Sequence, residues 1–418
     1  MASVLNTKEA LAREILLPYM ANTVFMTNSW RNYETQMVKW VSDTAAQVDI
    51  RLPNNYLVNK TWDVTSVDRT IDERYVSLIA DQIANVSFDI DSFEATFKID
   101  QEKAARTTEP AAINLSLDTD NYLALQLFYN SYHHLGTPGT LMNSWATVSS
   151  MTAYQNDLAM PDGGMRIGVL SEETYGSLGA DANLQNSNVN TLSNDITRKW
   201  RIGNLANQTL YHNHAIVKHT AGIGDVTATP SSGQVAAGAI KTAVSSGTVM
   251  VVKDLGTETG VFLKGDKITI PNRQFLHPKT LNPTGRPFQV TVTDTSVDSV
   301  SGDATVNFLP AIVTTGKYQN IDAELAVDDN LILSTGNSGL GSATKGTYTA
   351  NIFYHKSGLI FAAPQLKMLF KDDGFVNKDG ISLRVSSNGD ILKSLRTTRI
   401  DTFYGSYIDG TRTALYLG

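Results

Sequence analysis

The sequence predicts an α+β fold that carries an inserted antiparallel β-barrel. Residues 91–134 have apolar side chains at helical spacing, whereas residues 48–52 and 86–90 alternate between apolar and polar side chains, as half-buried strands do. From about residue 220 to 349 the chain becomes rich in Gly, Ser, Thr and Val, with short alternating runs between turn signals. Several short strands at regular spacing are typical of a small barrel or sandwich.

The first element is expected to be a helix. Asn6 and Glu9 have the spacing of a capping box, and Pro18 should kink or end the helix. The aromatic stretch over 20–33 is consistent with an N-terminal arm that docks outside its own domain. Packing on the local core is the alternative.

A long polar segment, 53–74, separates the two alternating stretches, which we interpret as the arms of one hairpin. Compact domains rarely keep so long a polar connection without a function. The segment is therefore either an ordinary hairpin loop or an extended hairpin that reaches a neighbouring chain.

The helical pattern that follows is long for a globular protein. Thr107 or Thr108 can cap the helix, with Pro110 in its first turn. His133 and His134 are interpreted as cations at its C-terminal end, where they would stabilise the helix dipole.

The next part of the chain is predicted to alternate helix and strand. A helix over 151–160 precedes a buried strand over 165–170, and Ser171 caps a further helix. Glu172 and Glu173 occupy the first turn of that helix, where the dipole favours negative charge.

The barrel strands are predicted from the alternating runs at 249–252, 261–263, 267–270, 288–292, 304–308 and 331–333. After the barrel the earlier pattern resumes, so we interpret the barrel as an insertion. Asn388-Gly389 predicts a hairpin turn, and Asp409-Gly410 predicts a second one.

Composition excludes several classes of function. The chain has 34 Lys+Arg against 41 Asp+Glu and no Cys. A protein whose main task is nucleic-acid binding needs dense positive charge, because counterion release supplies much of its affinity. The absence of Cys excludes disulfide frameworks, thiolate metal sites and cysteine nucleophiles. We expect no membrane-spanning helix and no secretory leader.

The search for an active site finds little. Motifs for a phosphate loop, a zinc protease, a serine hydrolase and a calcium loop are absent from the sequence. His212, His214 and His219 are the best candidates for metal ligands, but no carboxylate accompanies them at ligand spacing. We therefore expect no catalytic residue, cofactor or metal, and interpret the chain as a structural protein, not an enzyme.

Three segments carry a family resemblance. Residues 353–364 read FYHKSGLIFAAP, residues 261–270 read VFLKGDKITI, and residues 166–171 read RIGVLS. With the order of the predicted elements, they resemble the major capsid proteins of tailed phages with the Hong Kong 97 fold. The resemblance is to the P-twenty-two-like type, which carries an inserted β-barrel.

The resemblance implies a division of the chain into regions. They are an N-terminal arm (1–44), an extended loop (45–85), a peripheral domain with a spine helix (86–145), the first part of an axial domain (146–219), the inserted β-barrel (220–350), and a return to the axial domain and peripheral strands (351–418).

The function implied is a coat protein that assembles as hexamers and pentamers into an icosahedral head shell in the host bacterial cytoplasm. The implied partners are further copies of the chain, a separate scaffolding protein and a portal. Packaged DNA would make only weak, non-specific contact with the inner surface, and no membrane is involved. Four charged residues are candidate intersubunit contacts, with a solvated surface as the alternative for each: Arg51, Lys60, Asp63 and Arg69.

The alternative function is a β-rich virion protein that recognises a receptor or carbohydrate, or decorates the shell, through the barrel. A sugar-binding barrel would expose several aromatic faces. The aromatic residues here instead fall mostly at strand-like core positions: Phe262, Phe275, Phe288, Phe308 and Tyr318.

Overall fold

The computed structural model describes residues 7–33, 46–91, 101–185, 202–225, 233–335, 345–370, 373–390 and 395–418, apart from residues 57, 59, 61, 64 and 66–69. The chain divides into two compact units. Unit 1 consists of Met1–Leu52, Arg74–Leu123 and Leu359–Tyr407, and unit 2 of Pro53–Glu73, Ala124–Gly358 and Ile408–Gly418.

Unit 1 is built on a five-stranded sheet. The strand order is β18 (Leu359–Ala362), β21 (Leu395–Ile408), β20 (Ile381–Asp390) and β19 (Gly374–Lys378), and β3 (Gln82–Asp91) also pairs with β21. The pairing of β3 with β21 is antiparallel and continuous from Leu395↔Asp91 to Tyr404↔Gln82. The sheet therefore joins segments more than 300 positions apart in the sequence.

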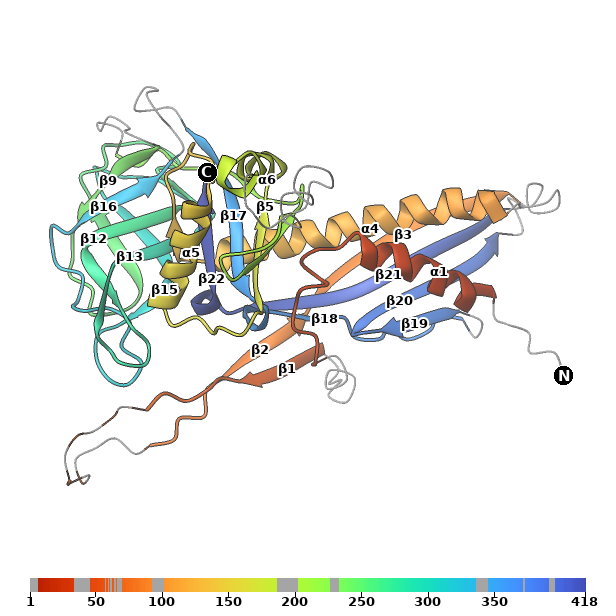
Figure 1. Cartoon of the computed structure of the whole chain (residues 1–418), viewed down its shortest axis with the longest axis horizontal. Helices are drawn as coiled ribbons and strands as arrows, with labels where there is room; N and C mark the ends of the chain where they lie inside the picture. Colours follow the sequence, from red (N-terminus) through yellow and green to blue (C-terminus); the bar gives the residue numbers. More distant parts are fainter. Residues whose placement is uncertain are drawn as a thin grey trace. The chain divides into compact units, whose positions relative to one another are not determined.

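Two helices lie against this sheet. The first part of α4 (Gln101–Asn130) runs along β3 and β21, and α1 (Thr7–Ala21) packs on β19 and β20 (Figure 1). The buried hydroxyl of Tyr19 lies 3.0 Å from that of Thr119 in α4. The N-terminal segment thus packs on the core of its own unit, and α1 continues past Pro18 to Ala21. The predicted cap at Asn6 lies outside the described residues.

A two-stranded antiparallel ladder also belongs to unit 1. It pairs β1 (Ala46–Arg51) with β2 (Tyr75–Ala80), and it buries Val48 and Leu78 against β18. The hairpin prediction was correct for its first arm and wrong for its second, because residues 86–90 lie in β3 and pair with β21. Alternation reveals a strand with one buried face, but it does not reveal which strand is its partner.

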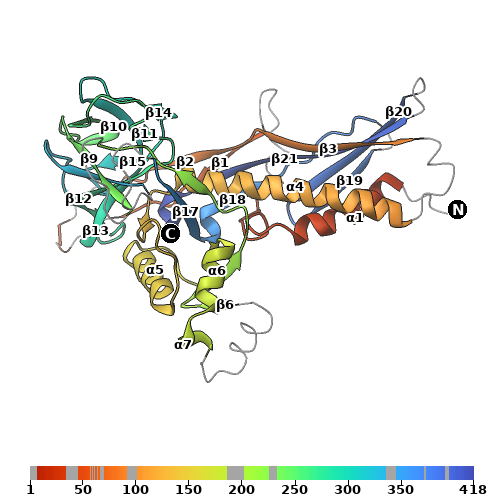
Figure 2. The ribbon, with the colours of Figure 1, turned by 90° about the horizontal axis from the view of Figure 1, so that it is seen from above.

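Unit 2 contains a seven-stranded sheet. Its strands, in order, are β4 (His134–Leu135), β22 (Thr413–Leu417), β17 (Thr347–His355), β5 (Arg166–Leu170), β7 (Gln208–His212) and β6 (Gly203–Leu205), with β8 (Lys218–Thr220) also on β17. The helices α5 (Trp145–Asp157), α6 (Glu172–Gly179) and α7 (Ala182–Gln185) belong to this unit, and α5 and α6 lie beside the sheet (Figure 2).

The prediction for the start of α6 is confirmed. The Ser171 hydroxyl accepts a hydrogen bond of 3.2 Å from the Thr174 amide, and Glu172 and Glu173 lie in the first turn. A side-chain acceptor at the N-cap satisfies one of the amides that the first helical turn leaves without a partner.

The predicted barrel is also confirmed. Six strands close on themselves in the order β10 (Ser246–Lys253), β15 (Ala304–Val313), β13 (Pro283–Val292), β12 (Lys267–Leu276), β16 (Asn330–Ser334) and β9 (Gln234–Ile240). A separate short ladder pairs β11 (Phe262–Leu263) with β14 (Ser296–Val297). The chain enters from β8 and leaves into β17, and these two strands pair with each other. The two ends of the insertion are therefore adjacent, as a tolerated insertion requires.

Several local predictions were wrong. The helix α4 begins at Gln101, so Pro110 lies inside it and neither Thr107 nor Thr108 is its cap. The predicted hairpin is present as the antiparallel pair of β20 and β21, but Asn388 and Gly389 lie within β20 and do not form its turn. At the remaining predicted turn, Asp409 is the N-cap of a short 3-10 helix, Gly410–Arg412.

That short helix joins β21 to β22, which belong to different sheets, so no hairpin forms there. With these sheets and the barrel, the described chain is more β-rich than the predicted α+β class. Within the described residues, no helix is long and apolar enough to cross a bilayer.

Candidate functional site

The candidate site is the connection between β1 and β2, residues Pro53–Glu73, which we call the loop. It belongs to unit 2 and exposes large apolar side chains. Trp62 is fully exposed and Val58 is 86% exposed, and Tyr56 and Ile71 are also on the surface. Large exposed apolar side chains are suited to contact with another protein chain. The sequence already contained this signal, since Trp62 and several other apolar residues stand in a stretch that is mostly polar.

Three of the four predicted contact residues lie among the described residues, and all three are exposed. Arg51 is exposed at the end of β1, and Lys60 is exposed in the loop. The exposed Asp63 carboxylate accepts hydrogen bonds from the Thr65 hydroxyl (2.6 Å) and amide (2.9 Å). These two bonds lower the pKa of Asp63, the hydroxyl having the larger effect. Asp63 thus shapes a local turn, and Arg69 lies outside the described residues.

Two residues that the sequence analysis missed hold the loop on the barrel. The Asn55 amide nitrogen donates to the Pro278 carbonyl (2.6 Å) and to the Lys317 carbonyl (2.7 Å). The Lys317 ammonium donates to the Thr70 carbonyl (2.8 Å) and forms a 2.7 Å ion pair with Asp72. The loop is therefore bound to the barrel at both of its ends, near Asn55 (the first leg) and near Thr70 and Asp72 (the second leg). The barrel residues involved lie between strands, after β12 and after β15, and no sequence motif identifies these pairs.

The histidines proposed as metal ligands lie in separate environments. His212 is 3.1 Å from the Glu172 carboxylate, whereas His219 is 2.7 Å from that of Asp266. His214 is exposed beyond the end of β7. Across the part of the chain that the structure describes, no three His, Asp or Glu side chains have the arrangement of a metal site.

A buried polar cluster joins the barrel to the C-terminal end of α4. The Lys267 ammonium donates to the carbonyls of Phe128 and Ser131 and to the Thr291 hydroxyl, at 2.7–2.9 Å. Burial holds the pKa of Lys267 well below its ordinary value. A side chain distant in the sequence thus satisfies carbonyls that the helix end leaves open.

His133 and His134 do not act as cations at this helix end. Both are buried, and burial lowers the pKa of each to about 3. They are neutral at pH 7, so the dipole interpretation was wrong. It failed because burial penalises the charged form of a histidine more than the dipole favours it.

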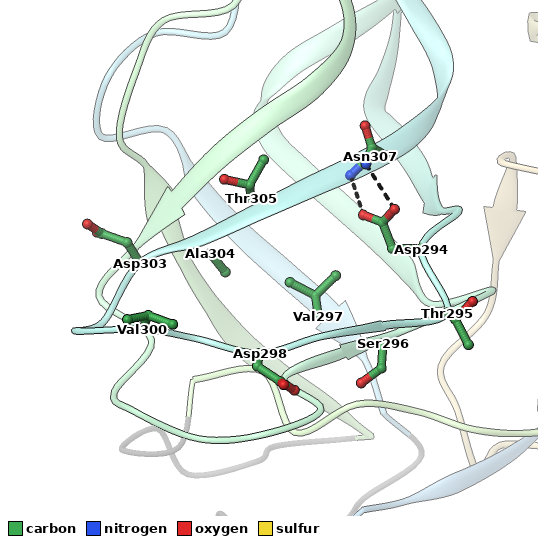
Figure 3. A pocket seen from close by; sticks show the side chains of 10 residues that line it. All are labelled: Asp294, Thr295, Ser296, Val297, Asp298, Val300, Asp303, Ala304, Thr305 and Asn307. Atoms are coloured by element: carbon green, nitrogen blue, oxygen red, sulfur yellow. Dashed lines mark hydrogen bonds between the residues drawn. The ribbon is translucent and has the colours of Figure 1, made fainter.

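Each unit contains a cavity among its described residues. One of about 620 Å³ lies on the barrel and is lined by Asp294, Asp298 and Asp303 (Figure 3). Each of these carboxylates has an internal partner: Asn307 for Asp294, the Gly260 amide for Asp298 and Lys241 for Asp303.

The other cavity, of about 510 Å³, lies in unit 1 between α1 and β19. Its lining is mainly apolar, with Arg13 and Lys378 among the residues that form it. Neither cavity contains a nucleophile paired with a base, so neither has the geometry of a catalytic site.

No protein-family model matches the chain, and no curated protein matches it. Several solved structures, in contrast, are similar to the chain. Over 94% of its length the chain is similar to 90% of a protein chain from Mycobacterium phage Che8, with 14% identity and a TM-score of 0.47.

It is also similar, over 88% of its length, to 80% of a chain in the capsid of Ralstonia phage GP4, with 9% identity and a TM-score of 0.44. A third similarity covers 94% of this chain and 86% of a chain in the bacteriophage PhiM1 mature capsid, with 9% identity and a TM-score of 0.43.

Proposed function

We propose that this chain is a major capsid protein, which assembles into the icosahedral head shell of a tailed double-stranded DNA phage. One observation carries the proposal. The loop exposes Tyr56, Val58, Trp62 and Ile71, yet it is anchored at both legs rather than folded back into a core. An anchored segment with an apolar surface is suited to contact a second copy of the chain.

The organisation follows from the family resemblance. We assign the N-terminal arm, extended loop, peripheral domain, axial domain and inserted barrel the boundaries stated in the sequence analysis. Hexamers and pentamers would form the shell in the host bacterial cytoplasm, with a separate scaffolding protein and a portal as partners. Arg51, Lys60, Asp63 and Arg69 remain proposed contact residues.

Charge supports this assignment. The chain has a net charge of −7, which disfavours tight binding to DNA because repulsion opposes contact with phosphates. A shell that encloses DNA is therefore expected to touch it only weakly and without sequence preference.

The alternative function, in which the barrel binds a carbohydrate or a receptor, has less support. Phe262, Phe275, Phe288 and Phe308 are each no more than 3% exposed. They fill the interior of the barrel region, so these rings present no face on which a sugar could stack.

Electron microscopy of the expressed full-length chain tests the proposal. The chain should form uniform closed shells, alone or with a lysate of phage-infected cells that supplies a scaffolding protein. Monomers or small oligomers under every condition would refute it and would favour the binding alternative.

A deletion within the loop tests the observation that carries the proposal. Removing residues 54–69 should leave a soluble protein that forms no stable shells, because the loop's apolar contacts are lost. Val300→Ser is the matched control, since it removes a 72% exposed apolar side chain from the barrel instead. Normal shells from the deletion variant would contradict the role of the loop.

A further inference from the structure

The loop is bound at two separated points by the barrel of its own chain. Asn55, on the first leg, binds the carbonyls of Pro278 and Lys317. Thr70 and Asp72, on the second leg, bind the ammonium of that same Lys317. One barrel residue therefore contacts both legs, through its backbone on one side and its side chain on the other.

These contacts differ from an ordinary surface ion pair. The Lys317 side chain is only 7% exposed, whereas Asp72 is 43% exposed. Exposed ion pairs contribute little to stability, but a desolvated ammonium that loses its partners is left with an uncompensated charge. The second leg of the loop therefore supplies partners to a buried ammonium, which favours this position of the loop.

These contacts of Asn55 and Lys317, which we call the clamp, fix the loop on either side of its exposed apolar residues. Between its anchors at Asn55 and Thr70 lie Tyr56, Val58 and Trp62. A tethered segment has fewer conformations to lose when it binds, so less of its binding free energy is spent on ordering. An anchored loop should consequently meet a second copy in a preorganised geometry.

We infer that Lys317 and Asn55 are positioning residues, through which the inserted barrel holds the loop of the same chain in its assembly geometry before a second copy binds. The assembly part of this inference rests on the proposed function, whereas the clamp itself does not. The barrel thereby gains a role in directing shell formation, in addition to being a folded insertion.

Hydrogen exchange of the unassembled full-length chain tests the clamp. Lys317→Met keeps the length of the side chain and removes its charge and donors. The backbone amides of residues 70–73, which the ammonium holds, should exchange about tenfold faster than in the unaltered chain. Lys253→Met is the matched control, because Lys253 forms an ion pair with Asp328 elsewhere on the barrel. Unchanged exchange in the loop of Lys317→Met would overturn the clamp.

A second variant guards against misfolding of the first. Asp72→Asn leaves Lys317 intact and keeps its bond to the Thr70 carbonyl, so the protein should fold. Exchange should then rise about threefold at residues 70–73 and remain unchanged in the barrel. Faster exchange throughout the barrel, or no increase of exchange at residues 70–73, would contradict a local clamp.

Assembly supplies the readout that a merely structural role would not change. In electron microscopy and sedimentation, Lys317→Met should need about ten times more protein than the unaltered chain to form shells. Shells at an unchanged concentration, despite faster loop exchange, would overturn the link between clamp and assembly. Failure of the unaltered chain to form shells would instead refute the proposed function, and the exchange experiment would still decide the clamp.

Discussion

The two buried histidines should make the protein less stable in mild acid, and His133→Phe tests this directly. Burial lowers the pKa of His133 and of His134 from 6.5 to about 3. The centroid of the His133 ring lies 4.4 Å from that of the Tyr132 ring and 4.6 Å from that of the Phe275 ring. Its Nδ1 has no hydrogen-bond partner among the described residues, so replacing this nitrogen by a carbon of Phe breaks no hydrogen bond there.

The direction in which the unfolding free energy changes with pH follows from proton binding. Between pH 6.5 and 3 the unfolded chain binds a proton at each histidine that the folded chain does not bind, so stability falls as the pH falls through this window. At pH 5 each histidine has lost about 2 kcal/mol relative to pH 7.5. The pair should therefore contribute a loss of about 4 kcal/mol, and His133→Phe should remove about half of it.

Urea denaturation at pH 7.5 and pH 5.0 measures this effect. The unassembled chain is used, with tryptophan fluorescence and circular dichroism as readouts. The control, His214→Phe, removes an exposed histidine and keeps the buried pair, so we expect it to retain the loss. An identical drop in unfolding free energy in His133→Phe and the unaltered chain would refute the argument.

Two further substitutions test packing in unit 1. Gly405→Ala would place a Cβ 2.1 Å from the Ile79 carbonyl oxygen, where β21 passes β2, so we expect a loss of at least about 2 kcal/mol in unfolding free energy; an unchanged thermal midpoint would contradict this close approach. Asp401→Asn removes a fully buried carboxylate 2.6 Å from Arg384 and 2.5 Å from Arg399. It should cost about 3 kcal/mol in a urea titration, and a loss below about 1 kcal/mol would show that the two guanidinium groups find water instead.

Local patterns predicted those elements whose cause is local. Ser171 with two glutamates after it identified the start of α6, because capping involves residues three positions apart. The barrel was likewise predicted from short alternating runs, such as that of β15, which buries Ala304, Val306 and Phe308 and exposes the residues between them.

Local sequence patterns failed where the structure of a segment depends on a partner that is distant in the sequence. Asn388-Gly389 has the composition of a turn, but pairing with Thr397 and Arg396 places both residues inside β20. The polar segment before β2 was recognised as a candidate site, yet its anchor, Lys317, lies about 250 positions away. A lysine in a polar turn has no sequence feature that distinguishes a buried clamp from a solvated charge.

By itself, the sequence determined that the chain lacks the motifs of catalysis, carries a β-barrel insertion and presents a long connection at its first hairpin. These properties depend on composition and on periodicity within a few residues. Only the tertiary structure decided that β3 pairs with β21, that Lys267 rather than His133 serves the end of α4, and that the barrel holds the loop. The physical reason is that strand pairing, burial of charge and anchoring depend on which distant groups the fold brings within hydrogen-bonding distance.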